Sequence, residues 1–234
     1  MCGRYTLKSS SAQIAATFGV PAPPTLPERF NIAPSQAVLA VRLQPDTHRR
    51  ELVLLKWGLV PAWARDPAIG HRMINARSET AATKPAFRGS FRARRCLIVA
   101  DGFYEWQTRK GRKQPFYIRL KSGAAFGFGG LWDRWDKQAG PVESCTILTC
   151  AANEVTRAIH DRLPVVIPRE QFARWLDPDE HDSGKLSELL RPFHPDEMTA
   201  FPVTTLVNNV RHDSPLNIEP ATSDEPPPPA RLFD

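Results

Sequence analysis

The chain has 234 residues, enough for one large domain or two small ones with a buried core. Its 31 lysine and arginine residues outnumber its 25 aspartate and glutamate residues, and basic stretches at 88–95 and 109–113 indicate either a surface that faces a polyanion or two solvated loops. No signal peptide or membrane-spanning apolar run is found, so we expect a cytoplasmic protein, associated with the nucleoid if bacterial, that does not bind membranes.

The predicted elements are short and closely spaced. In chain order, the pattern predicts a helix at 7–19, strands at 37–41 and 51–60, at most a short helix within 73–80, strands at 95–100, 103–106, 115–120, 125–132 and 144–151, and helices at 153–160, 170–176 and 184–191. We expect the strands at 115–120 and 125–132 to pair with each other. Because few helices cross over between strands, the sequence predicts an α+β fold with a curled, mainly antiparallel, barrel-like sheet flanked by short helices.

The C-terminal end differs in composition from the rest. Residues 221–234 are too rich in proline and charge to pack into a core, and they predict a flexible tail. The remaining residues, 1–220, are then expected to form a single domain.

The four cysteines lie at positions 2, 96, 145 and 150. They form no CxxC pair and no cysteine and histidine spacing typical of zinc, so we expect no structural metal, and no motif calls for an organic cofactor. Cys96, Cys145 and Cys150 lie in apolar runs, as buried free thiols do. Reduced thiols are expected in the cytosol.

Cys2 is the exception because of its position. Removal of Met1 would leave Cys2 with a free α-amine beside a free thiol. The α-amine is largely deprotonated near pH ~8 and the thiol titrates close by, so both groups can act as nucleophiles. Such a 1,2-aminothiol captures an aldehyde first as an imine and then as a five-membered thiazolidine. A chance Met-Cys start is the alternative.

Three polar residues are out of place for a pure core. Asn75 lies between Ile74 and Ala76, where it is either a structural turn residue or an amide that orients a substrate. Glu105 ends an apolar strand, where burial would raise its pKa towards a range useful for proton transfer, unless it forms a cross-strand salt bridge. His160 ends a predicted helix, where it is either a helix cap, a surface residue or a proton donor. Together with Cys2, these side chains supply what imine chemistry needs.

Six motifs carry a resemblance to a known family. They are MCGRY at 1–5, RFNIAPSQ at 29–36, KWGLVPAW at 56–63, INARSET at 74–80, RRCLIVADGFYEW at 94–106 and IHDRLPVVI at 159–167. In this order the chain resembles the SRAP family, named for SOS-response-associated peptidases, over roughly residues 2–220. The resemblance implies a shield for abasic sites in DNA repair and the DNA damage response. Such a protein binds single-stranded DNA, often at a junction with duplex, and cross-links to the ring-opened sugar as a thiazolidine.

The resemblance also implies roles for individual residues. Cys2 is the nucleophile, and Asn75 positions the sugar and the N-terminus. Glu105 resembles the family's proton-transfer residue, and His160 the residue that promotes opening of the closed sugar and reversal of the link. The family has lyase and autoproteolytic character, the latter releasing whatever precedes the cysteine, here Met1. One protomer per abasic site requires only a monomer.

The DNA contacts come from residues near these motifs. Arg77 and Arg162 resemble phosphate contacts, and Arg4 is a further candidate. Trp106 and Trp63 are expected to stack or wedge against bases. Trp63 lies in the segment where family members vary in length and register.

Two other classes and one partner remain open. Glutamine amidotransferases also begin Met-Cys-Gly, although a synthase-like second domain is missing here. A non-catalytic reader of modified DNA bases is the other class. At the C-terminal end, residues 230–234 vaguely resemble the Leu-Phe peptides that dock on the bacterial replication sliding clamp, with an idle tail as the alternative.

Overall fold

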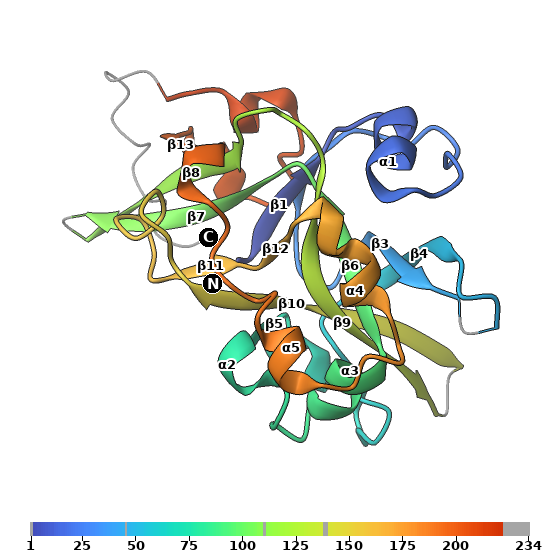
Figure 1. Ribbon diagram of the computed structural model, residues 1–234. Coiled ribbons are helices and arrows are strands. Elements are labelled where there is room, and N and C mark those ends of the chain that lie inside the picture. The colour runs from blue at the N-terminus through green and yellow to red at the C-terminus, as the bar shows by residue number, and fades with distance from the viewer. Residues whose placement is uncertain (1, 45, 110, 138–139, 222–234) are drawn as a thin grey trace.

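The computed structural model describes residues 2–221 apart from 45, 110 and 138–139 (Figure 1). Within these residues the strands are β1 (Arg4–Leu7), β2 (Arg29–Ile32), β3 (Ala37–Leu43), β4 (Arg50–Trp57), β5 (Asn75–Arg77), β6 (Arg95–Ala100), β7 (Gly102–Arg109), β8 (Arg112–Leu120), β9 (Phe126–Asp136), β10 (Pro141–Ala151), β11 (Arg162–Pro164), β12 (Val166–Ile167) and β13 (Met198–Pro202). The α-helices are α1 (Ser11–Phe18), α2 (Ser78–Ala81), α3 (Arg88–Ala93), α4 (Phe172–Leu176) and α5 (Ser183–Ser187). The clamp-binding prediction lies in the tail, outside the described residues.

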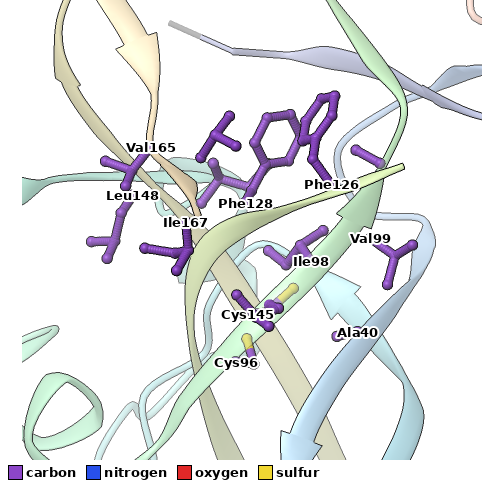
Figure 2. Close-up of a cluster of buried hydrophobic side chains, with 14 of the residues drawn as sticks. Ala40, Cys96, Ile98, Val99, Phe126, Phe128, Cys145, Leu148, Val165 and Ile167 are labelled. Atoms are coloured by element: carbon purple, nitrogen blue, oxygen red, sulfur yellow. The ribbon is translucent and has the colours of Figure 1, made fainter. Parts of the chain in front are cut away.

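Five strands close into a barrel. Their cyclic order is β4-β3-β6-β9-β10, and β10 returns to pair with β4. Within this ring only the β4–β10 pair is parallel. Apolar side chains such as Ile98 and Phe128 fill the cluster in Figure 2 together with the thiols of Cys96 and Cys145. A Cβ on Gly130 of β9 would lie 2.9 Å from the Cys96 sulfur, so this glycine lets β9 and β6 approach closely.

A second sheet has the strand order β13-β8-β7-β1-β2. The chain passes from the barrel into it at Asp101, between β6 and β7. The buried Asp101 carboxylate accepts hydrogen bonds from the Thr6 hydroxyl at 2.6 Å and from the backbone N–H groups of Lys8 and Ser9 at 2.6 and 2.8 Å. These bonds fix the end of β1 against the corner. In the antiparallel β1–β7 pair, Arg4 lies opposite Tyr104, so the start of β1 lies beside Glu105.

The α+β, mainly antiparallel, barrel-containing fold predicted from the sequence is confirmed. The first helix is also confirmed: Ser10 and Gln13 form a capping box, and Gly19 ends the helix in the left-handed conformation. Helix α4 forms within 170–176, and α5 is shorter than the helix predicted at 184–191. Among the described residues, no helix is long and apolar enough to cross a membrane.

Two local predictions were wrong. The segments 115–120 and 125–132 do not pair, because β8 pairs with β7 and β13 whereas β9 pairs with β6, β10 and β12. The apolar, glycine-rich β9 is buried on both faces and suits the barrel, which accounts for its choice of partners. Residues 153–160 form successive turns rather than a helix. There the Asn153 side chain accepts hydrogen bonds from the N–H and hydroxyl groups of Thr156, and such local bonds compete with helical ones.

Candidate functional site

Cys2 lies two residues before the start of β1 and is completely buried. Its carbonyl oxygen accepts a hydrogen bond of 2.8 Å from the side-chain Nδ2 of Asn75. Asn75 begins β5, which runs parallel to β10 with Asn75 opposite Ile147. Strand pairing therefore fixes the amide that holds the main chain of Cys2. Within the described part of the chain, the buried Oδ1 of Asn75 has no hydrogen-bond partner.

Glu105 lies in β7 and is only 2 % exposed. Burial raises the pKa of its carboxyl group, while the nearby His160 acts in the opposite direction. Burial also raises the pKa of the Cys2 thiol, and the negative charge of Glu105 adds to this effect. The sulfur is therefore held as a thiol at neutral pH, next to a carboxylate that can accept its proton.

A cavity of about 470 Å³ opens beside these groups. It is lined by Arg4, Glu105, Trp106, Thr108, Lys113, His160 and Asn208. The lining comes from β1, β7, β8 and two connecting segments, so residues far apart in the sequence meet at one place. Its size falls within the range of small-molecule sites in proteins.

Of the four predicted catalytic residues, Glu105 and His160 line the cavity, whereas Cys2 and Asn75 do not. Asn75 binds the carbonyl of Cys2, Glu105 acts on the Cys2 thiol electrostatically, and His160 shares the cavity with Glu105. The predicted DNA contacts are more dispersed. Arg4 and Trp106 line the cavity, and the Trp106 indole N–H donates to Asn208 Oδ1 at 2.7 Å.

Arg77 and Arg162 have different surroundings. Arg77 is exposed at the end of β5, and its side chain makes no hydrogen bond or ion pair with the described residues. Arg162 forms a bidentate ion pair with Glu79, at 2.6 and 2.8 Å, and donates to the carbonyl oxygen of Thr149. Of these two arginines, Arg77 presents an uncommitted guanidinium to solvent, whereas a phosphate at Arg162 has to compete with Glu79.

Trp63 lies outside the cavity. It is 56 % exposed and lines a separate pocket of about 560 Å³ together with Arg65 and Arg72. An aromatic ring that lines a pocket together with two cations is suited to a base and its phosphates, but this pocket shares no lining residue with the cavity beside Glu105.

Three lining residues were not singled out from the sequence. Lys113 belongs to the basic stretch 109–113, which was its only signal. Thr108 lies on the same strand as Glu105, and neither the alternation of apolar residues nor a charge marks it as a site residue in the sequence. Asn208 ends the 3-10 turn Thr205–Asn208 and reaches the cavity through its bond to Trp106, which only the tertiary structure brings about.

The same residues offer no ready metal site. Within the described ranges, no group of three or more histidine, cysteine, aspartate or glutamate side chains could hold a metal ion. All four cysteines are buried free thiols.

Comparison with known proteins decides the family. Residues 1–210 match the family model described as SOS response associated peptidase (SRAP). The chain belongs to the SRAP family. Among its SRAP relatives, abasic site processing protein YoqW from Bacillus subtilis is 42% identical over 226 residues, which cover 94% of this chain and 99% of YoqW. Abasic site processing protein HMCES from Gallus gallus is 33% identical over 77% of this chain and 60% of HMCES.

Solved structures support the SRAP fold. A protein from Bacteroides thetaiotaomicron superposes with a TM-score of 0.84 at 25% identity, covering 94% of this chain and all of the other. A protein from Bordetella bronchiseptica superposes with a TM-score of 0.73 at 28% identity, over 87% of this chain and all of that chain. The family resemblance recognised from the six motifs is confirmed.

Proposed function

We propose that this protein processes abasic sites in DNA by forming a covalent thiazolidine cross-link through Cys2. The names of YoqW and HMCES as abasic site processing proteins support the substrate. The observation that carries the chemistry is the placement of the Cys2 main chain against Asn75, with the thiol under the influence of Glu105.

The first step opens the sugar. An abasic site is mostly a closed hemiacetal, and only the minor open form carries an aldehyde. Opening requires that the anomeric hydroxyl loses a proton while the ring oxygen gains one. His160 and Glu105 line the same cavity and are suited to exchange these two protons.

The second step captures the aldehyde. After removal of Met1, the α-amine of Cys2 adds to the aldehyde carbon, and loss of water gives an imine. The Cys2 sulfur then adds to the imine carbon while its proton is transferred to nitrogen, which closes the thiazolidine without loss of atoms. Glu105 can relay that proton because its carboxylate acts on the thiol. The bond from Asn75 to the Cys2 carbonyl restricts the rotation of the reacting residue.

Ring closure explains why the sulfur matters. An imine at an abasic site activates the adjacent carbon for β-elimination, which breaks the strand in a lyase reaction. Addition of the thiol removes the imine and so protects the strand. The autopeptidase character of the family belongs to the same site, because the α-amine becomes available only when the residue before Cys2 has been released.

Single-stranded DNA is the proposed partner, with an adjoining duplex as a further contact. Arg4 and Lys113 place positive charge on the wall of the cavity, and Trp106 offers an aromatic surface there. Arg77 is an exposed cation on β5 and is proposed as a further phosphate contact. Trp63, in its separate pocket, is proposed to contact bases beyond the abasic site.

Mass spectrometry tests the proposal. Purified protein is mixed with a single-stranded oligonucleotide that contains one abasic site, and both the intact protein and its peptides are weighed. We expect a heat-stable adduct on the Cys2 peptide, without Met1. The variant Cys2→Ser is expected to give a labile imine with strand cleavage, and Cys2→Ala is expected to give no stable adduct. A stable adduct on Cys2→Ala, or none on the wild type after Met1 removal, would contradict the mechanism.

A further inference from the structure

His160 has two different partners at the same ring nitrogen. The backbone N–H of Arg162 donates to Nδ1 over 2.9 Å, and the Asp161 carboxylate oxygen Oδ1 lies 2.9 Å from the same atom. The first contact needs a lone pair on Nδ1, and the second needs a proton there. One nitrogen cannot satisfy both at once, so the partner in use depends on the protonation of the ring.

The main chain around His160 is held firmly. The Arg162 backbone pairs with Ala151 in the β10–β11 ladder, and its side chain is clamped by Glu79. The carbonyl oxygen of Asp161 accepts a hydrogen bond of 3.0 Å from Ala152 N–H. The Arg162 N–H and the main chain of Asp161 therefore stay in place whether the ring is neutral or charged.

We propose that Asp161 is a positioning residue for His160, accepting the Nδ1 proton of the charged ring, while the Arg162 amide donates to Nδ1 of the neutral ring. Nε2 carries a proton in both states and is left to serve the sugar. The charged ring gives this Nε2 proton to the sugar oxygen, and the proton that remains on Nδ1 stays in its bond to Asp161, so the transfer needs no rotation of the ring. Exchange with water afterwards restores the neutral ring whose proton lies on Nε2. This inference rests on the abasic-site chemistry proposed above, to which it adds the residue that controls its proton donor.

Several other charges act on the same ring. Glu105 of β7 favours the charged ring, as Asp161 does, whereas Arg4 of β1 and Lys113 of β8 disfavour it from the cavity wall. Arg162 and Arg157 contribute positive charge from the chain segment of His160 itself, although Glu79 neutralises Arg162. Replacing Asp161 with asparagine removes one of these charges and leaves the others, so a change can be assigned to Asp161.

The main experiment is the pH profile of cross-linking. Single-turnover rates of adduct formation with a single-stranded abasic oligonucleotide are measured at low salt from pH 5 to pH 9 for the wild type and Asp161→Asn. Loss of the carboxylate makes the charged ring less favourable, so the limb due to His160 is expected to move to lower pH, and only slightly because Asp161 is exposed. In a His160→Gln background, adding Asp161→Asn should change nothing further.

The chain offers a matched control. His194 Nδ1 lies 3.7 Å from Asp196 Oδ2, a second contact between a histidine and an exposed aspartate close by in the sequence, but neither residue lines the cavity beside Glu105. The Asp196→Asn variant is therefore expected to keep the wild-type profile. Asp161 is 87 % exposed, so both substitutions should leave the melting temperature near that of the wild type.

A second measurement does not depend on DNA. Nitrogen-15 NMR of the imidazole in the free protein should place the proton of neutral His160 on Nε2, and Asp161→Asn should move the titration midpoint of His160 to lower pH. A proton on Nδ1 of the neutral ring, or superimposable titrations, would overturn the inference. If the wild type forms no adduct, the proposed function fails, while the NMR titration still decides the role of Asp161.

Discussion

The side-chain amide of Asn75 donates a hydrogen bond of 2.8 Å to the carbonyl oxygen of Cys2. Two chain segments 73 residues apart thereby fix the main chain of the proposed nucleophile. In Asn75→Ala the carbonyl loses this donor, and we expect roughly fivefold slower cross-linking, because one hydrogen bond contributes about 1 kcal/mol. Single-turnover kinetics with saturating DNA measure the effect.

Non-covalent affinity supplies the control for Asn75. Its Nδ2 is occupied by Cys2, so the dissociation constant for DNA without an abasic site should be unchanged in Asn75→Ala. A variant that cross-links at the wild-type rate would show that the bond to Cys2 does not position the nucleophile.

Arg77 should contribute to DNA affinity through charge alone. Its exposed guanidinium has no protein partner among the described residues, so a phosphate can bind it without breaking an ion pair. We expect Arg77→Gln to weaken binding for every sequence alike. The slope of log K against log salt concentration should fall by about 0.7, the value for one phosphate contact in single-stranded DNA. Fluorescence anisotropy across a salt series measures both quantities.

Arg49 offers a matched control for Arg77. It is also exposed, but it lies at the turn between β3 and β4, away from the residues that line the cavity. Arg49→Gln should keep the wild-type slope. Equal slopes for Arg77→Gln and the wild type would exclude a phosphate contact at Arg77.

Substitution of Arg95 is expected to have a large effect on stability. Although only 3 % exposed, it donates to the backbone carbonyl groups of Phe91, Arg92, Trp175, Asp177 and Glu180. These bonds tie the segment after α4 to the barrel, and burial lowers the pKa of Arg95 to about 10. Lysine cannot reproduce the planar fork, so Arg95→Lys is expected to lower the free energy of unfolding by about 2–4 kcal/mol.

Urea unfolding followed by circular dichroism checks this value. The exposed neighbour Arg92 supplies the control, because Arg92→Lys should change stability by less than about 0.5 kcal/mol. Similar midpoints for the two variants would mean that the carbonyl contacts of Arg95 are replaceable by water.

The sequence predicted local features well where a short pattern determines them. The first helix and the buried strand β6 are examples, since the pattern that predicts each depends on residues close together in the chain. The strands with which β8 and β9 pair were not predictable in this way. Both segments read as strands, and their partners depend on how the barrel closes through β10, which no local pattern encodes.

The site residues also fall into two groups, those that the local sequence predicts and those that only the tertiary structure brings to the cavity. Asn75, Glu105 and His160 were recognisable because polar residues stood beside apolar ones and because the family motifs contain them. Asn208 was not predicted, because its place at the cavity depends on a hydrogen bond to Trp106, 102 residues away in the sequence. The commitment of Arg162 to Glu79 was likewise invisible, since the two residues meet only when β11 and α2 lie beside β10.

Glu105 leads to a pH-dependent prediction for stability. Burial raises its folded-state pKa above the value of about 4.3 expected in the unfolded chain. Its neutral form therefore favours folding at low pH, and this contribution is lost as the pH rises through the folded value. Glu105→Gln remains neutral, so its melting temperature should exceed that of the wild type at pH 8, and the difference should shrink towards pH 4.5. The same variant should cross-link more slowly at every pH, because it cannot accept the Cys2 proton.

Differential scanning calorimetry across this pH range separates the two roles of Glu105. Glu154→Gln, at an exposed position in the turn before His160, serves as the control and should show no pH-dependent difference from the wild type. A Glu105→Gln protein that is less stable than the wild type at pH 8 would mean that the carboxylate is held by favourable contacts that outweigh its burial. Active sites commonly retain a group that opposes stability because the chemistry needs it, so higher stability combined with slower cross-linking is the result expected of a proton-transfer residue.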